Sequence, residues 1–428
     1  MDIGLVLLLG VFAVCVVIGL PVAFALGIAA VAAFWWDGLP LLVAFQRIVS
    51  GVNVFSLLAI PFFIFAGELM FHGGIAERLV RFASAVVGAV RGGLGIVNVF
   101  SSMLFGGISG SAVADVSALG SILVPVMKEK GYDDDYAVNV TVTSSIAGIM
   151  IPPSHNMILY AVAAGGGISI SSLFLAGVVP GIVMCVCLAA AAYLIAVRRG
   201  YPAEAFPGGR ALLVTFVQSL PGLFTAVIIV GGVLSGIFTV TESGAFGTIY
   251  AGLVTLIVYR SLSWRGFLTA VTRAVRTTSM VLILVACAAA FGYMLSFHKV
   301  PNQVVALMTG ISDNPVAILL MINLALLILG MIMDMAALIL ICTPIFLPVA
   351  AQLGMDPLQF GMLLMMNLGL GLCTPPVGAC LFVGCAIGEV PMERAVRTIW
   401  PFYIAILIAL MLTTFVPAIS LTLPRLLG

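Results

Sequence analysis

Long apolar segments recur along the chain and decide the solvent in which it folds. Helices of about 17 to 25 residues suffice to cross a bilayer, and suitable stretches occur at 54–71, 136–165, 172–197, 217–237, 242–259, 277–297, 358–388 and 399–420. Residues 3–36 form another, either one long tilted helix or two short helices divided at Pro21. Hydrophobic residues make up 63% and charged residues 8% of the chain, whereas soluble domains carry about 25% charged residues. The sequence therefore predicts an all-α polytopic protein in a lipid bilayer.

Two further apolar stretches, at 93–127 and 314–349, are interrupted midway by small or polar residues. The interruptions read GGISGSA at 106–112 and GMIMDMA at 330–336. Each arm then has about 13 to 15 residues, or roughly 20 Å, which is too short to span a membrane. We expect two re-entrant helical hairpins alongside about 11–12 transmembrane segments.

The two hairpins belong to an internal repeat. Adding 223 to the residue number pairs Gly107 with Gly330, Pro125 with Pro348, Gly131 with Gly354, Asp133 with Asp356, Gly148 with Gly371, and Pro152-Pro153 with Pro375-Pro376. Five expected crossings separate the two copies, and an odd number turns the second copy upside down. The sequence therefore predicts an inverted-topology repeat, a construction typical of secondary transporters.

The distribution of basic residues supports this topology. If the first hairpin enters from the cytoplasm, only Arg47, Lys299 and Arg425 of the 17 lysines and arginines fall outside, as the positive-inside rule requires. Residues 73–91 and 299–313 then become interfacial arms that lead into the hairpins. We expect scaffold helices and the first arm at 1–91, one half of a transport domain at 92–170, further scaffold and the second arm at 171–313, the other half at 314–393, and a C-terminal helix at 394–428.

Both copies carry a proline pair inside an apolar run, in SSIAGIMIPPSHNMILYA at 144–161 and LGLGLCTPPVGACLFV at 368–383. Proline breaks a helix, and a break inside the membrane leaves peptide groups unpaired at a cost of several kcal/mol each. Carbonyls can bind cations, and the N-termini of half-helices can bind anions. Simple kinking for packing is the alternative, which the doubled and repeated proline pair disfavours.

Several segments, in their order along the chain, resemble the large membrane subunit of tripartite ATP-independent periplasmic (TRAP) transporters. They are AIPFFIFAGELMFHGGIAERL, FGGISGSAVADVSALGSILVPVMKEKGY, GIMIPPSHNMILYA, FTVTESGAFGTIYA, LGMIMDMAALILICTPIFLPVA and TPPVGACLFV. The resemblance implies a sodium-driven, elevator-type importer in a bacterial or archaeal cytoplasmic membrane, not an enzyme. It also implies a small four-helix membrane partner, a soluble periplasmic protein that delivers a carboxylate, and no cofactor other than the coupling sodium ions.

The resemblance further implies two sodium sites, formed mostly by backbone carbonyls. The first falls on Ser109, Ser111, Gly148, Ile151 and Pro153, and the second on Gly330, Gly371, Thr374 and Val377. The candidate substrate-binding residues are Ser154, His155, Asn156, Asp115, Asp334, Pro152, Pro375 and Pro376. The sequence departs from the family in two places. His155-Asn156 stands where the family often has apolar residues, and Val240 stands before Thr241-Glu242 where the family commonly has proline.

These side chains also have structural interpretations. Asp115 and Asp334 lie near the hairpin tips, where each is functional or caps a helix N-terminus. Ser154 and Asn156 can donate to a carboxylate at the start of the half-helix after the prolines, while His155 can be a satisfied neutral group. Since neither tip nor broken helix contains lysine or arginine, an anion depends on helix N-termini, sodium and neutral donors, or on a scaffold arginine such as Arg47.

Two other functions stay open at this point. One is a stand-alone sodium-coupled carboxylate or ion transporter of the same superfamily, and the other is an intramembrane hydrolase using Asp115, Asp334 or Ser154, which lacks the geometry of a triad. Net charge of +1 without a basic cluster argues against nucleic acid. The eight cysteines lie inside apolar segments and are expected to act as small apolar filler.

Overall fold

The computed structural model describes residues 3–427. Residues 1, 2 and 428, which the expected N-terminal part and C-terminal helix include, lie outside this range. The described residues form helices joined by turns and loops, with one isolated bridge between Arg91 and Ala203. The predicted all-α, polytopic class is confirmed.

The described helices include six that are long and apolar enough to cross a membrane, or eight if each of two bent pairs is one span. Eight shorter apolar helices have 10 to 17 residues. The sequence predicted more full-length spans than this. The structure has fewer because breaks divide several of the apolar runs into short helices. Residues 3–36, for example, form α1 (Ile3–Val17) and α2 (Val22–Trp36), with Pro21 as the cap of α2. The amphipathic helix α3 (Leu41–Val52) was not expected.

The sequence repeat is also a repeat of elements, since α17 has the bounds of α7 raised by 223. In the first copy the hairpin consists of α6 (Gly93–Ser109) and α7 (Ala112–Glu129). The broken helix follows as α8 (Asp134–Ser144), α9 (Ala147–Met150) and α10 (His155–Ala163). In the second copy the hairpin is α16 (Pro315–Gly330) and α17 (Met335–Gln352), and the broken helix is α18 (Pro357–Leu372) and α19 (Ala379–Gly388).

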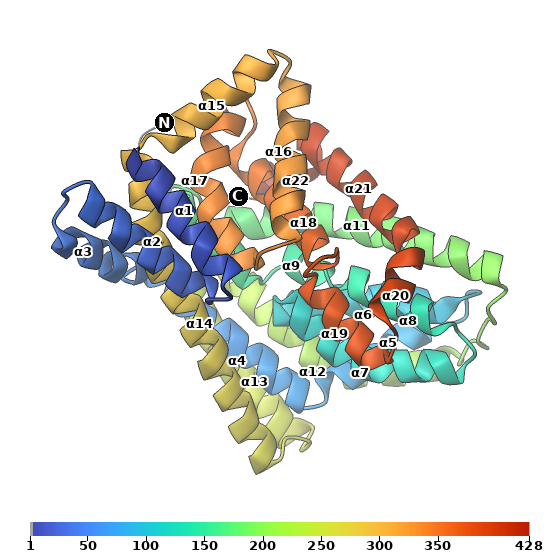
Figure 1. The fold of residues 1–428 in the computed structure, drawn as a ribbon. Helices are drawn as coiled ribbons and strands as arrows, with labels where there is room; N and C mark the ends of the chain where they lie inside the picture. Colours follow the sequence, from blue (N-terminus) through green and yellow to red (C-terminus); the bar gives the residue numbers. More distant parts are fainter. Residues whose placement is uncertain (1–2, 428) are drawn as a thin grey trace.

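Each hairpin is preceded by a helical arm, as expected. The first arm is α5 (Ile75–Val87), which follows η1 (Phe55–Leu58) and α4 (Ala59–His72). The second arm is α15 (Val300–Ile311), which follows the long helix α14 (Trp264–Phe297). In Figure 1, α14 runs obliquely from beside α2 toward the end of the molecule formed by α13, while α15 lies at the opposite end.

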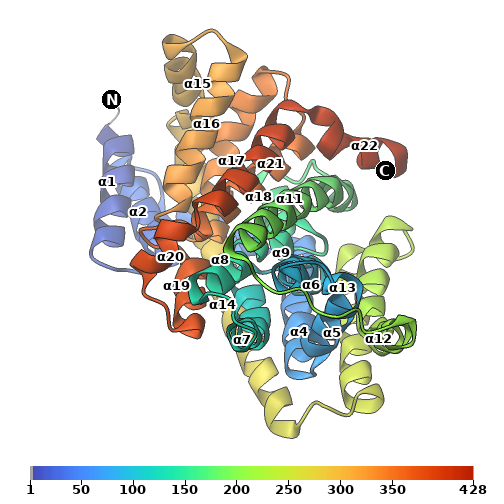
Figure 2. The ribbon, with the colours of Figure 1, turned by 90° about the vertical axis from the view of Figure 1, so that its right-hand side faces the viewer.

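The remaining helices flank these repeats. They are α11 (Ile170–Arg199), α12 (Gly209–Leu234), α13 (Val240–Leu253) with the π-helical turn η2 (Val254–Val258), α20 (Met392–Thr398), α21 (Trp400–Phe415) and α22 (Pro417–Leu427). Helix α4 packs on both α13 and α14, whereas α11 packs on α6, α9, α18, α21 and α22. Figure 2 shows α11, α18 and α21 together, away from α12 and α13. Helix α11, in the segment expected to belong to the scaffold, thus packs both on the hairpins and broken helices and on the C-terminal helices α21 and α22.

Buried polar pairs join the first hairpin arm to the broken helix in each copy. In the first copy the Asn98 side-chain amide donates to the Thr141 hydroxyl at 2.6 Å, and the Ser144 hydroxyl donates to Asn98 Oδ1 at 3.2 Å. In the second, Asn367 Nδ2 donates to Asn323 Oδ1 at 2.8 Å. Ser144 and Asn367 correspond under the offset of 223. Apolar side chains alone do not fix how one helix aligns along its neighbour in a membrane, whereas these hydrogen bonds do.

Candidate functional site

The tip of the first hairpin, residues 106–111, packs directly on the break of the first broken helix. A β-carbon on Gly106 would overlap the backbone of Gly148. Gly110 has a positive φ of 63°, and a β-carbon there would lie 3.1 Å from the Pro153 carbonyl oxygen. Glycine permits both the close approach and the left-handed backbone. The tip and the break therefore meet, as the sequence predicted.

The structure brings together the five residues of the first expected sodium site. The β-carbon position of Gly148 lies 3.8 Å from Ser109 Oγ and 3.7 Å from the Ser111 carbonyl oxygen. Ile151 packs on the same tip through Gly107, as Pro153 does through Gly110. Among the hydrogen bonds of residues 3–427, none ends on the carbonyl oxygen of Ile151 or Pro153.

The tip of the second hairpin packs in the same way on the second break. A β-carbon on Gly371 would lie 2.5 Å from the carbonyl carbon of Gly330. The Val377 N–H donates to the Met331 carbonyl oxygen at 3.1 Å. The tip of hairpin 2 is therefore joined to its break by a backbone hydrogen bond as well as by close packing.

Carbonyls ahead of the second proline pair have hydrogen-bond partners, whereas those of residues 374–376 accept none among residues 3–427. The carbonyl oxygen of Gly371 accepts from the Thr374 N–H at 3.0 Å, and that of Cys373 accepts from the Tyr403 hydroxyl at 2.6 Å. The Thr374 hydroxyl donates to the Leu370 carbonyl oxygen at 2.7 Å, which leaves its lone pairs free. Of the expected sodium ligands here, Thr374 is half-buried and Val377 is 53% exposed.

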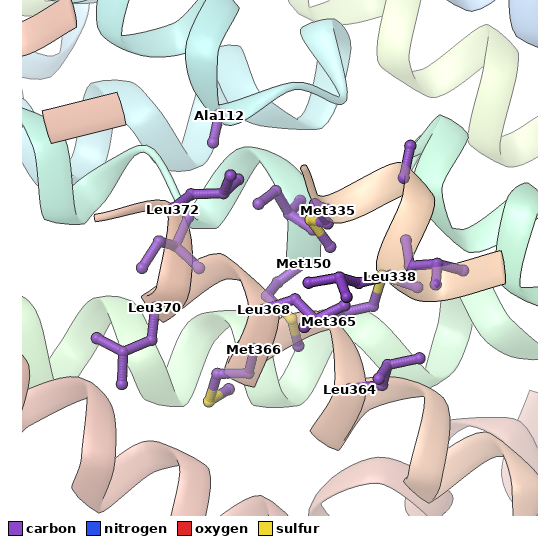
Figure 3. Packing of buried hydrophobic residues seen from close by; sticks show 14 of the residues in the cluster. Ala112, Met150, Met335, Leu338, Leu364, Met365, Met366, Leu368, Leu370 and Leu372 are labelled. Atoms are coloured by element: carbon purple, nitrogen blue, oxygen red, sulfur yellow. The ribbon is translucent and has the colours of Figure 1, made fainter. Parts of the chain in front are cut away.

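Both tips and both breaks line one cavity of about 260 Å³, which we call the tip cavity. Its lining residues include Ala112 and Met335 from the tips, Asn156 and Leu372 from the breaks, and Leu284 from α14. Figure 3 shows Ala112, Met335 and Leu372, together with Met150, gathered around one centre. The junction predicted from the repeat is therefore hollow and has α14 as its further wall.

A second cavity of about 300 Å³, the side cavity, adjoins the first. The two share Ser111, Val113, His155 and Thr277 as lining residues. The side cavity extends between the first hairpin tip and the scaffold helices α4 and α14, where Glu68 and Arg273 line it. Chemically, this is a chamber with an apolar centre and a polar side arm.

Several polar side chains around the first tip have no hydrogen-bond partner among the described residues. Ser109 Oγ, Ser154 Oγ and His155 Nδ1 are buried and unpaired, and so are both carboxylate oxygens of Asp115, although Ser102 lies beside it. Ser109 and His155 line the side cavity, whereas Ser154 and Asp115 do not. A buried unpaired polar atom costs about 1–3 kcal/mol, and five such atoms lie around this one contact.

The other candidates fall in different places. Asp334 lines the tip cavity and caps α17, accepting from the Ala336 N–H at 2.9 Å, so its capping interpretation holds. Pro152, Pro375 and Pro376 line neither cavity, and the prediction that they contact substrate has no support in this geometry.

Arg47 also lies away from both cavities. Its guanidinium carbon stacks 4.3 Å from the centre of the Tyr293 ring, which anchors α3 on α14. The sequence missed Glu68, Arg273 and Thr277 as cavity residues. The spacing of Arg273 and Thr277, one turn apart on α14, is the signal that places them on one face, but only packing shows that this face meets the hairpin tip.

Comparison with known proteins now fixes the family. A family model described as "Tripartite ATP-independent periplasmic transporter, DctM component" matches residues 9–419. The chain belongs to the DctM family. Its relatives include the protein YgiK of Salmonella typhimurium, 40% identical over 99% of this chain and 97% of that protein, and the sialic acid TRAP transporter large permease protein SiaM of Vibrio cholerae, 37% identical over 95% of each. The DctM protein of Rhodobacter capsulatus, named for C4-dicarboxylate TRAP transport, is 34% identical over 99% of each chain.

Solved structures support the fold of this DctM-family chain. The YdaH transporter of Alcanivorax borkumensis superposes with a TM-score of 0.68 over 90% of each chain at 14% identity. MtrF of Neisseria gonorrhoeae gives a TM-score of 0.59 over 88% of this chain and 84% of that chain, at 12% identity. The DctM family consists of transporter permease subunits rather than enzymes, which removes the hydrolase alternative.

Proposed function

We propose that this chain is the large permease subunit of a TRAP transporter that couples the uptake of a small organic acid to sodium entry. The observation that carries the proposal is the junction of the first hairpin tip with its broken helix. There, unpaired hydroxyls and carbonyls without hydrogen bonds lie at the contact, beside two adjoining cavities that Ser109 and the N-terminus of α10 line together with α14.

The sodium sites are proposed on the two tip–break contacts. Sodium is a hard cation that binds oxygen ligands, and unwound backbone in transporters commonly supplies them. Ser109, Gly148, Ile151 and Pro153 offer such oxygens in the first contact, where carbonyls lack partners. In the second contact the Thr374 hydroxyl retains free lone pairs.

An organic acid is the proposed solute. Relatives are named for sialic acid, C4-dicarboxylate and isethionate transport, and the α10 N-terminus with Asn156 at its first turn can donate hydrogen bonds to an acidic group. Substrate and sodium together would satisfy polar groups that have no hydrogen-bond partner within the protein.

We further propose an elevator movement and partner subunits. The hairpins and broken helices would move, with α11, against a scaffold that includes α4 and α14, because the cavities lie between these two groups of helices. The family implies a small membrane subunit and a periplasmic binding protein in a bacterial inner membrane, and one relative is a fused permease called DctMQ.

The test is uptake into proteoliposomes that contain this chain and the small membrane subunit encoded with it. Labelled sialic acid, succinate and isethionate would be supplied with and without an inward sodium gradient, each with and without the cognate soluble receptor. We expect uptake of one acid that requires both sodium and the receptor. Uptake indifferent to the receptor would instead indicate the stand-alone transporter, and uptake indifferent to sodium would exclude sodium coupling.

A further inference from the structure

We infer that Arg273, on the scaffold helix α14, binds the acidic group of the solute in the conformation described by the structure. The inference rests on the proposed function and adds a residue that the moving hairpins and broken helices cannot provide.

Among the described residues that line the two cavities, Arg273 is the one arginine, and there is no lysine. It is exposed in the isolated chain, and one turn further along α14, Thr277 lines both cavities. A solute held at the tip cavity therefore needs to extend past Thr277 by about one helical turn, roughly 5 Å, to reach the guanidinium.

The Arg273 guanidinium has no close partner in the described part of the chain. Arg273 makes no hydrogen bond, and no ion pair within 4.0 Å, with any residue from 3 to 427. Arginine presents five donors in a planar fork that fits a carboxylate. The same cavity is lined by Ser109, whose hydroxyl is buried with 6% exposure and has no partner, and by His155, whose Nδ1 is likewise unpaired. One cavity thus brings together an arginine from α14 and unpaired polar atoms from the first hairpin tip and its break.

One carboxylate shares the cavity and offers an alternative role for the arginine. Glu68 and His72, both on α4, lie close enough to Arg273 to interact with it electrostatically. His72 Nε2 lies 3.6 Å from Glu68 Oε2. If Arg273 served only to neutralise Glu68, removing either charge would produce the same defect. If Arg273 binds the solute, Glu68 competes with the acidic group, and removing its charge strengthens solute binding.

The experiment uses the complete membrane complex in proteoliposomes and the labelled acids named above. The variants are Arg273→Gln, Arg273→Lys, Glu68→Gln and the matched control Arg276→Gln, which changes an exposed arginine of the same helix that lines neither cavity. We expect R273Q to raise KM about tenfold with a smaller change in kcat, because a charge-assisted contact is lost. R273K should restore part of the affinity, R276Q should match the unchanged protein, and E68Q should lower KM because the competing carboxylate is gone.

A second measurement does not depend on turnover. In Arg273→Cys, a charged thiol reagent should react about threefold or more slowly when sodium and the transported acid are present. In Arg276→Cys, the reaction rate should be the same with and without them. The unchanged chain, which has eight cysteines, gives the background reaction. A slower reaction at position 273 when sodium and the acid are present supports the inference. An unchanged rate at position 273 overturns it.

The failures are distinguishable. If the unchanged complex transports an acid but R273Q keeps its KM, or if E68Q reproduces the R273Q defect, the inference about Arg273 is wrong while the proposed function stands. If the unchanged complex transports none of the acids, the proposed function itself fails, and the inference fails with it.

Discussion

The two tip–break contacts share one backbone arrangement but differ in what they leave unpaired. In the first, the Ser109 hydroxyl and His155 Nδ1 are buried without partners, whereas the carbonyls at equivalent positions of the two breaks, 151–153 and 374–376, accept no hydrogen bond among residues 3–427 in either copy. In the second, the break is tied to the tip through Val377 and Met331, and Tyr403 satisfies a freed carbonyl. A duplicated fold has therefore kept its geometry while the chemistry diverged, and the first copy is the stronger candidate for ion and solute binding.

The largest expected effect tests whether both contacts are needed. Gly106→Val and Gly371→Val would each force a side chain into the facing backbone, so we expect the loss of sodium-driven uptake, by about a hundredfold or more, in both variants. Gly292→Ala, which meets no atom within 4 Å, is the control. Retained uptake in G371V alone would mean that the second contact is dispensable.

The next prediction concerns an ion pair present in one copy only. Arg199 at the end of α11 contacts Asp133 at 2.8 Å and the buried Asp135 at 3.1 Å, whereas Asp356, the counterpart of Asp133, caps α18 instead. Arg199→Gln leaves a buried carboxylate unpaired, so we expect a loss of about 2–3 kcal/mol in unfolding free energy. Chemical denaturation in micelles measures it, with Arg198→Gln as control; equal effects would show that the pair contributes little.

Sodium dependence can sharpen the comparison between the two contacts. Ser109→Ala removes an unpaired buried hydroxyl, and we expect the sodium concentration for half-maximal uptake to rise about tenfold. Thr374→Ala removes a hydroxyl that is already bonded to Leu370, and we expect a rise of about threefold or less. Uptake would be titrated with sodium at constant ionic strength using choline, and a larger effect at Thr374 would reverse the ranking of the contacts.

The smallest expected effect concerns the polar pairs that the two copies share. Asn98→Ala and Asn367→Ala each remove buried hydrogen bonds between a hairpin arm and a broken helix. Interhelical hydrogen bonds in membranes contribute about 0.6 to 1.7 kcal/mol, so we expect about 1 kcal/mol of destabilisation from each in the same denaturation assay. A markedly larger loss from one of them would show that the two copies carry unequal structural loads.

The sequence predicted the parts of the fold that depend on local chemistry. Proline pairs, glycine-rich tips and the offset of 223 locate the hairpins and breaks, and the hairpins meet the breaks as expected. It did not predict which scaffold face meets the tips. The sequence places Arg273 among the cytoplasmic charges and does not mark Glu68 as a cavity residue, because tertiary packing decides which side chains face each other across two groups of helices. The same limit explains why Pro375 and Pro376 were placed with the substrate residues although they line neither cavity.

The wall supplied by α14 is not uniform along its length. It presents Val281 and Leu284 to the tip cavity and Arg273 to the side cavity, with Thr277 between them. For an anion carried along this helix, the wall adds a free energy that changes with position, so affinity at the two ends of the path is unequal even without any gradient across the membrane. A passive helix cannot alter the overall equilibrium. The direction with the higher affinity must therefore have the lower maximal rate. Import and export by the same molecule would then differ in both KM and maximal rate.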